Sequence, residues 1–225
     1  MKIIVSTFSD NVFINDIKNN IKLVNDFVDQ GNMFIIATGK NITNVVKLID
    51  NIDFKCSYYI CNDGSTIFDN LLNVIYRVDI DPKIVKLIYN SLDNLSCVTD
   101  VKIDVSTGFL DDYMRATNKI VAKYENKKVA TEVVKILNSK FDSIYAYLSN
   151  NYINITNKEN SKGSALEYIL NYYNLKDNDI YTISKDMNDD SLSSPYDSYV
   201  VGNEIYNFKH KVNSFKEALE KIAKS

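Results

Sequence analysis

Short apolar runs alternate with longer amphipathic segments along most of the chain. The first run, within Lys2–Ser6, is β-branched and uninterrupted, which is typical of a strand buried on both faces of a parallel sheet. Ile14–Gln30 follows with apolar residues at helical spacing, and Gly31 gives it a C-terminal stop. A second strand, Met33–Ala37, and a second helix, Asn41–Ile52, repeat this order. The alternation predicts a parallel sheet with right-handed crossovers.

The same unit continues with a third strand and a hairpin, and it resumes near the C-terminus. Tyr58–Cys61 is the expected third strand, and Asn62–Ser65 is a turn signal before the alternating segments Thr66–Phe68 and Val74–Val78. The later elements expected for this unit are a helix over Ser164–Tyr173, strands over Asp179–Ile183 and Tyr199–Val201, and a helix over Ser214–Ala223.

The rhythm changes after Asp81-Pro82, where a strand no longer alternates with a single helix. The elements expected there are a helix over Pro82–Leu95, strands over Val98–Val105 and Lys119–Tyr124, a helix over Lys127–Leu137, and strands over Ile144–Ser149 and Tyr152–Thr156. Helix-strand-strand thus occurs twice, with the stretch up to Tyr113 unassigned. We interpret residues 80–157 as an α+β module inserted into an α/β core of residues 1–79 and 158–225; one continuous domain is the alternative.

Composition limits the class of protein and says less about the chemistry that it performs. The 225 residues are 45% hydrophobic and 12% aromatic, and the net charge is −3 without a basic stripe. This argues against nucleic acid as a partner. No apolar run is long enough to span a bilayer, and we expect no membrane association and no signal peptide. Three cysteines without metal-ligand spacing fit a reducing cytoplasm. His210, the only histidine, is expected to be a surface or packing residue.

Polar residues follow the first two strands. Thr7, Ser9, Asp10 and Asn11 come after the first strand, where ligands of open α/β sheets bind. Thr38-Gly39-Lys40 ends the second strand and precedes a helix. A hydroxyl together with backbone N–H groups at a helix N-terminus suits an anion, although an ordinary Thr cap is the alternative.

These motifs resemble the haloacid dehalogenase (HAD) superfamily of phosphatases. The first strand and its turn are similar to the family's D-x-D-G-T motif, with Thr7 at the position of the aspartate nucleophile and Ser9 at that of the aspartate acid/base. Thr38 falls on the phosphate-binding Thr or Ser of the second motif. Asn62–Ile67 resembles the N-G-A-x-I turn that leads towards the family's cap.

The third and fourth motifs follow the inserted module. Asn160–Leu166 matches K-G-x-A-L, so the resemblance implies that Lys162 neutralises phosphate and nucleophile; a solvated lysine is the alternative. In the G-D-x-x-N-D motif, Lys185 falls on the first Asp, and Asn188 and Asp189 fall on N-D. A register one residue later would instead use Asp186 and Asp190. We prefer the first register because Ile183 then ends the strand and Leu192 falls on the next apolar position.

The resemblance implies a Rossmann-like HAD core with a small α+β cap of the Cof type, similar to phosphoglycolate-phosphatase-like members. It also implies phosphomonoester hydrolysis, but Thr7 and Ser9 replace both catalytic carboxylates. Thr7 removes the covalent aspartyl-phosphate route, and the pKa of the Ser9 hydroxyl is too high for acid/base work near neutrality. Mg²⁺ needs hard oxygen ligands, and Lys185 would compete with it.

We therefore predict an inactive or very weak phosphatase without a metal cofactor. Its pocket would bind a small phosphorylated molecule or an inorganic anion, and Lys162 and Lys185 would face Asp189 as the one clear anion. The residues assigned to phosphate binding are Thr38, Gly39, Lys162, Lys185 and Asn188. The alternative is a divergent Mg²⁺-dependent hydrolase of a small phosphorylated metabolite, with Asp10, Asp186 or Asp189 in rearranged geometry; Asp189 and Asp186 would then be the metal ligands.

Overall fold

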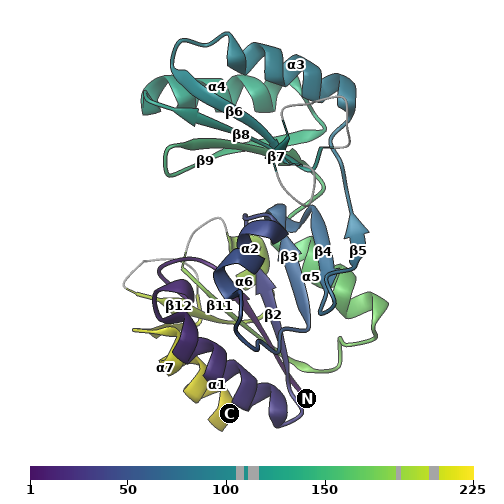
Figure 1. Cartoon of the computed structure of the whole chain (residues 1–225), viewed down its shortest axis with the longest axis vertical. Helices are drawn as coiled ribbons and strands as arrows, with labels where there is room; N and C mark the ends of the chain where they lie inside the picture. The colour runs from purple at the N-terminus through teal and green to yellow at the C-terminus, as the bar shows by residue number, and fades with distance from the viewer. Residues whose placement is uncertain (105–108, 111–116, 186–188, 203–207) are drawn as a thin grey trace.

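A computed structural model describes residues 1–104, 109–110, 117–185, 189–202 and 208–225. The described residues form two lobes, each built on its own sheet (Figure 1). The larger sheet has eight described strands in the order β13-β12-β11-β1-β2-β3-β4-β5, and the smaller has five in the order β7-β6-β8-β10-β9. This is the α/β class with a parallel-sheet core that the hydrophobic pattern predicts.

The strands of the larger sheet are parallel from β13 to β3, and β3, β4 and β5 are joined by antiparallel pairing. Their bounds are β1 Lys2–Thr7, β2 Met33–Ala37, β3 Tyr58–Cys61, β4 Thr66–Asp69, β5 Val74–Arg77, β11 Asp179–Ser184, β12 Asp197–Val201 and β13 His210–Val212.

Helices cover both faces of the larger sheet because its central strands are apolar on both faces. In β1, Ile4 packs in the cluster with α1 and α7, whereas Ile3 and Val5 pack in the cluster with α5. The helices of this lobe are α1 Ile17–Asp29, α2 Ile42–Ile49, α5 Lys162–Tyr172, α6 Asp190–Ser193 and α7 Phe215–Lys224. One-turn 3-10 helices occupy Ile14–Asp16 and Asn62–Gly64.

The smaller sheet carries its helices on one face only, and its other face is turned towards the larger lobe (Figure 1). Along β9, Ile144, Ala146 and Leu148 pack in the helix-covered cluster, so period-2 alternation directs Tyr145 and Tyr147 the other way. The elements are α3 Pro82–Asp93, β6 Val98–Asp104, β7 Phe109–Leu110, β8 Lys119–Tyr124, α4 Lys127–Lys140, β9 Ile144–Ser149 and β10 Tyr152–Asn157.

Several boundaries differ from those expected from the sequence. Helix α5 begins at Lys162 rather than Ser164, because Ser161 and Ser164 form a reciprocal capping box. Lys162 therefore lies in the first helical turn. The pattern did not indicate α6 or β13, which have only four and three residues. The unassigned stretch up to Tyr113 includes β7 and otherwise lies outside the described residues.

Cys56 and Cys61 are buried and free, as expected for core residues. His210 is exposed, stacks on Tyr199 and lies 3.1 Å from Asp197. No helix in the described part of the chain is long and apolar enough to cross a membrane.

Candidate functional site

The ends of three adjacent strands bring predicted site residues together at the carboxyl edge of the larger sheet. Strand β1 lies between β11 and β2, with Ser6 opposite Ile183 and Thr7 opposite Ala37. Thr7, Thr38 and the residues after Ser184 therefore leave adjacent strands on the same side. We call Thr7, Ser9, Thr38 and Lys185 the strand-end site.

The hydroxyls of Thr7 and Ser9 are buried at this edge. Neither Thr7 Oγ1 nor Ser9 Oγ has a hydrogen-bond partner among the described residues. A buried hydroxyl without a partner costs roughly 1–3 kcal/mol. The surroundings of these two hydroxyls therefore favour an additional hydrogen-bonding group beyond the described residues.

Thr38 and Lys185 complete the described part of this site. Thr38 Oγ1 accepts a hydrogen bond from the backbone N–H of Lys40 at 3.2 Å and is 3.5 Å from the carbonyl of Phe8. Asn41 caps helix α2 by accepting from the N–H of Asn44 at 2.9 Å. Lys185 is half-buried and its Cε approaches Gly202. Asn188 and Asp186 lie outside the described residues.

Lys162 points towards two carboxylates. Its Nζ donates to Asp189 Oδ1 at 2.6 Å and lies 3.7 Å from Asp63 Oδ1. The Asp189 side chain is 3% exposed and that of Lys162 is 11% exposed, so this ion pair is shielded from water. Asp189 belongs to the first register of the fourth motif. Asp190, which belongs to the second, is exposed at the start of α6.

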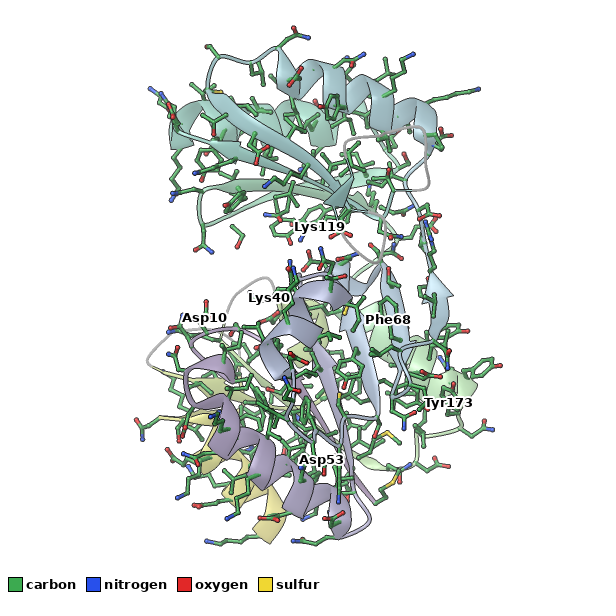
Figure 2. The ribbon with its side chains drawn as sticks, in the orientation of Figure 1. Asp10, Lys40, Asp53, Phe68, Lys119 and Tyr173 are labelled. Atoms are coloured by element: carbon green, nitrogen blue, oxygen red, sulfur yellow. The ribbon has the colours of Figure 1, made fainter. Side chains whose placement is uncertain are left out.

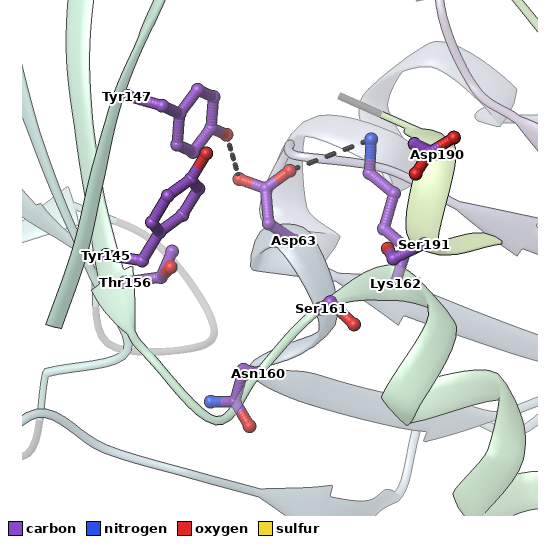
Figure 3. Close-up of a pocket in the computed structure, with 9 residues that line it drawn as sticks. All are labelled: Asp63, Tyr145, Tyr147, Thr156, Asn160, Ser161, Lys162, Asp190 and Ser191. Carbon is purple, nitrogen blue, oxygen red and sulfur yellow. Dashed lines mark hydrogen bonds and ion pairs between the residues drawn. The ribbon is translucent and has the colours of Figure 1, made fainter. Parts of the chain in front are cut away.

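Asp63 changes the charge balance expected from the sequence. Among the motif positions, Asp189 is the one clear anion expected near Lys162. The structure adds Asp63 as a second, largely buried carboxylate facing the same lysine (Figure 3). The Asn-Asp-Gly sequence indicates a turn, and this turn directs the carboxylate inward.

Two residues of the smaller lobe also contact Asp63. Lys119 Nζ and the Tyr147 hydroxyl each donate to Asp63 Oδ2 at 2.6 Å, and Lys119 Nζ also donates to the Gly39 carbonyl at 3.1 Å. No local sequence signal indicates either contact, because these residues are 56 and 84 positions away from Asp63. We call Asp63, Lys119, Tyr147 and Lys162 the Asp63 cluster.

A third carboxylate, that of Asp104, joins the lobes nearby. Asp104 lies at the end of β6 and is 1% exposed. Its Oδ2 accepts from Asn41 Nδ2 at 3.0 Å, and its Oδ1 lies 3.4 Å from Asn62 Nδ2. The helix cap after strand β2 and the turn after β3 are therefore both tied to the smaller sheet.

A cavity of about 240 Å³ lies between the two lobes beside the Asp63 cluster (Figure 3). This is smaller than the roughly 300–1,000 Å³ of pockets for drug-sized ligands, so it suits a small ion or metabolite. It is lined by Asp63, Tyr145, Tyr147, Thr156, Asn160, Ser161, Lys162, Asp190 and Ser191. The Tyr145 and Tyr147 rings stack 5.8 Å apart on its side formed by the smaller lobe.

Similarity to a known protein family covers most of the chain. A family model described as haloacid dehalogenase-like hydrolase matches residues 9–108 and 100–216. Among curated proteins, no sequence matches this chain.

Solved structures show the same fold at low sequence identity. A haloacid dehalogenase-like hydrolase from B. subtilis aligns at TM-score 0.84 with 11% identity, over 100% of this chain and 99% of the other. A phosphatase of the haloalkanoate superfamily from Bacteroides thetaiotaomicron aligns at 0.80 with 14% identity, over 100% and 94%. A HAD subclass IIB sugar phosphatase aligns at 0.78 with 14% identity, over 100% and 98%.

Proposed function

This chain belongs to the haloacid dehalogenase-like hydrolases, and from that premise we propose that it is a member with absent or very weak phosphatase activity that keeps a pocket for a phosphate-like anion. The observation that carries the proposal is the pair of buried hydroxyls at the end of β1, Thr7 and Ser9. The family resemblance puts its two catalytic carboxylates at these positions. A threonine cannot form an aspartyl-phosphate, and a serine hydroxyl is a poor general acid or base near neutrality because its pKa is far too high.

The described donors at this edge fit Mg²⁺ poorly. No group of three or more His, Cys, Asp or Glu side chains that could hold a metal ion exists among the described residues. Asp189 is engaged by the Lys162 ammonium at 2.6 Å, and Lys185 adds a second positive charge at the end of β11. Mg²⁺ prefers carboxylates and water oxygens in octahedral geometry. Metal-independent binding therefore stays our prediction.

Three features support an anion pocket at the strand-end site. The Thr7 hydroxyl has no partner among the described residues, and it leaves the sheet beside Thr38. Helix α2 begins just after Thr38, so its N-terminal backbone dipoles favour negative charge there. Lys185 leaves the neighbouring strand with a positive charge. A phosphate-like anion would accept hydrogen bonds from these groups.

The alternative is Mg²⁺-dependent hydrolysis of a small phosphorylated metabolite. The similarity in fold to a sugar phosphatase over the whole chain favours it. The two functions separate in an assay of p-nitrophenyl phosphate and sugar phosphates with Mg²⁺ and with EDTA. We expect background turnover in both buffers. Strong wild-type turnover that EDTA abolishes would overturn the proposal and establish the alternative.

A restoration experiment tests whether the missing carboxylates are the cause. The triple variant Thr7→Asp, Ser9→Asp, Lys185→Asp rebuilds the acidic positions of the family motifs. We expect Mg²⁺-dependent turnover above background in this variant. The same variant with Asn in place of each introduced Asp is the matched control, since it has similar side chains without the charges.

Anion binding is measured by calorimetry with inorganic phosphate in EDTA. We expect binding by the wild-type protein and roughly tenfold weaker binding by Lys185→Ala, because a charge-assisted hydrogen bond contributes about 1.5–3 kcal/mol. Lys211→Ala removes an exposed lysine of β13 and is the control. No heat and no thermal stabilisation of the wild type at millimolar phosphate would contradict an anion pocket.

A further inference from the structure

We propose that Asp63 is an internal counter-anion that competes with a bound anion for the ammonium groups of Lys119 and Lys162. Lys119 is then an anion-binding residue that the smaller lobe contributes. This inference rests on the proposed anion pocket and adds what controls its affinity. Its basis is the arrangement of one carboxylate between two lysines from different lobes. Figure 3 shows Asp63 and Lys162, and Figure 2 shows Lys119 on the side of the smaller lobe that is turned towards the larger one.

The two lysines approach different oxygens of the same carboxylate. Lys119 Nζ is 2.6 Å from Oδ2, and Lys162 Nζ is 3.7 Å from Oδ1. The Tyr147 hydroxyl donates to Oδ2 as well, at 2.6 Å. A carboxylate that is hydrogen-bonded by one ammonium group and faced by another uses positive charges that would also attract the oxygens of a phosphate.

The backbone around Asp63 fixes the position of its carboxylate. Asn62, Asp63 and Gly64 all have positive φ, at 51°, 55° and 98°. The Asp63 N–H donates to the Thr38 carbonyl at 3.1 Å. A Cβ on Gly39 would lie 2.8 Å from Asp63 Oδ1, so glycine at position 39 leaves room for the carboxylate.

Burial and charge hold Asp63 in its ionised form. The side chains of Asp63 and Lys119 are 15% and 5% exposed. Burial alone would raise the pKa of Asp63, but the charges of Lys119 and Lys162 and the hydrogen bonds from Lys119 and Tyr147 lower it well below its usual range. The carboxylate is therefore a permanent negative charge at neutral pH.

An external anion needs the same donors that Asp63 now uses. Asp63 and Lys162 both line the 240 Å³ cavity, so a small anion can reach them from it. Any anion that contacts these lysines must displace the Asp63 carboxylate or share its donors under electrostatic repulsion. Removing the charge of Asp63 should therefore strengthen anion binding, although it removes no steric barrier.

The test is calorimetric titration with inorganic phosphate in EDTA. Asp63→Asn keeps the side-chain shape and removes the charge, and we expect phosphate to bind at least tenfold more tightly. Asp190→Asn is the matched control, because Asp190 lines the same cavity but is exposed on α6. A general electrostatic effect would strengthen binding equally in both variants, whereas direct competition predicts less than a twofold change for Asp190→Asn.

Substitution of Lys119 provides a second test, which does not require the Asp63 variant to fold. Lys119→Met should weaken phosphate binding at least fivefold, and Lys123→Met, at an exposed position of the same strand, should not change it.

Two results would overturn the inference. One leaves the proposed anion pocket standing, and the other overturns it as well. Equal affinity for wild type, Asp63→Asn and Lys119→Met would overturn competition and leave the anion pocket standing. Absence of phosphate binding by both wild type and Asp63→Asn would overturn the anion pocket and the inference with it.

Discussion

The strand-end site and the Asp63 cluster differ in how their buried polar groups are satisfied. At the strand-end site, the hydroxyl oxygens of Thr7 and Ser9 have no hydrogen-bond partner among the described residues. In the Asp63 cluster, one carboxylate receives hydrogen bonds from two residues of the other lobe and faces a third donor. The hydroxyls without partners indicate where a ligand can accept or donate hydrogen bonds. In the Asp63 cluster, the protein itself supplies the negative charge that its lysines contact.

The largest expected effect comes from breaking the turn that supports the Asp63 cluster. A Cβ at Gly64 would lie 2.1 Å from the Ser161 carbonyl, and Gly64 has φ 98°. Gly64→Ala should therefore lower the free energy of unfolding by about 4 kcal/mol, through a backbone clash and left-handed strain. Urea unfolding measures it.

Gly31→Ala is the matched control for this prediction. Gly31 also has a positive φ, 84°, but a Cβ there would meet nothing within 4 Å. We expect a cost of about 1 kcal/mol from strain alone. Equal destabilisation by the two substitutions would show that the close approach to Ser161 contributes nothing.

Removing Lys162 from the Asp63 cluster should have the next largest effect. Lys162→Met leaves Asp189, whose side chain is 3% exposed, without its charged partner and should cost about 3 kcal/mol in urea unfolding. Adding Asp189→Asn should recover part of that loss, because it removes the uncompensated charge.

The control for the lysine is an exposed ion pair. Lys135→Met disrupts a contact with Glu132 in which both side chains are more than 60% exposed, and it should cost at most about 0.5 kcal/mol. A cost for Lys162→Met no larger than this would mean that the buried pair contributes no more than a surface pair.

Two substitutions with smaller expected effects test the prediction that residues 80–157 form a separate domain. Ile120 and Ile36 are both fully buried, in the clusters of the smaller and larger lobes. Ile120→Val and Ile36→Val should each cost about 1 kcal/mol. If the lobes unfold separately, calorimetry will show each substitution shifting a different transition; a shared shift of one transition would contradict the division.

The smallest expected effect is the change in the free energy of unfolding when the Asp63 cluster is exposed to acid pH. Because the pKa of Asp63 is lowered by Lys119, Lys162 and Tyr147 despite its burial, its ionised form stabilises the fold above the unfolded pKa near 4. That stabilisation is lost as pH falls from about 4 towards the lowered pKa. The difference in unfolding free energy between wild type and Asp63→Asn should therefore shrink below about pH 4. A difference that stays constant from pH 7 to pH 3 would contradict this assignment.

The strands were the most predictable part of the fold. Met33–Ala37, Tyr58–Cys61, Lys119–Tyr124 and Ile144–Ser149 have the bounds that the apolar pattern predicts. Strand β13 was missed because a three-residue element is too short to show a period. The start of α5 was placed two residues late, although the Ser161–Ser164 capping signal was present in the sequence.

The candidate site was predictable only where a motif lies within a few consecutive residues. Thr7, Thr38 and Lys162 are candidates from the sequence because each ends, follows or opens an element with a recognisable local sequence, and their roles stay predictions. Lys119 and Tyr147 were not found, since nothing in β8 or β9 distinguishes a residue that faces the larger lobe from one that faces solvent.

The alternating strands and helices, and the match to a haloacid dehalogenase-like hydrolase family, follow from the sequence alone. The position of Asp63 between Lys119 and Lys162 is visible only in the folded chain. Periodicity and turn signals act over a few residues, so they encode local structure directly. The charge state and partners of a buried group depend on which distant segments pack against it. For Asp63, these segments belong to both lobes.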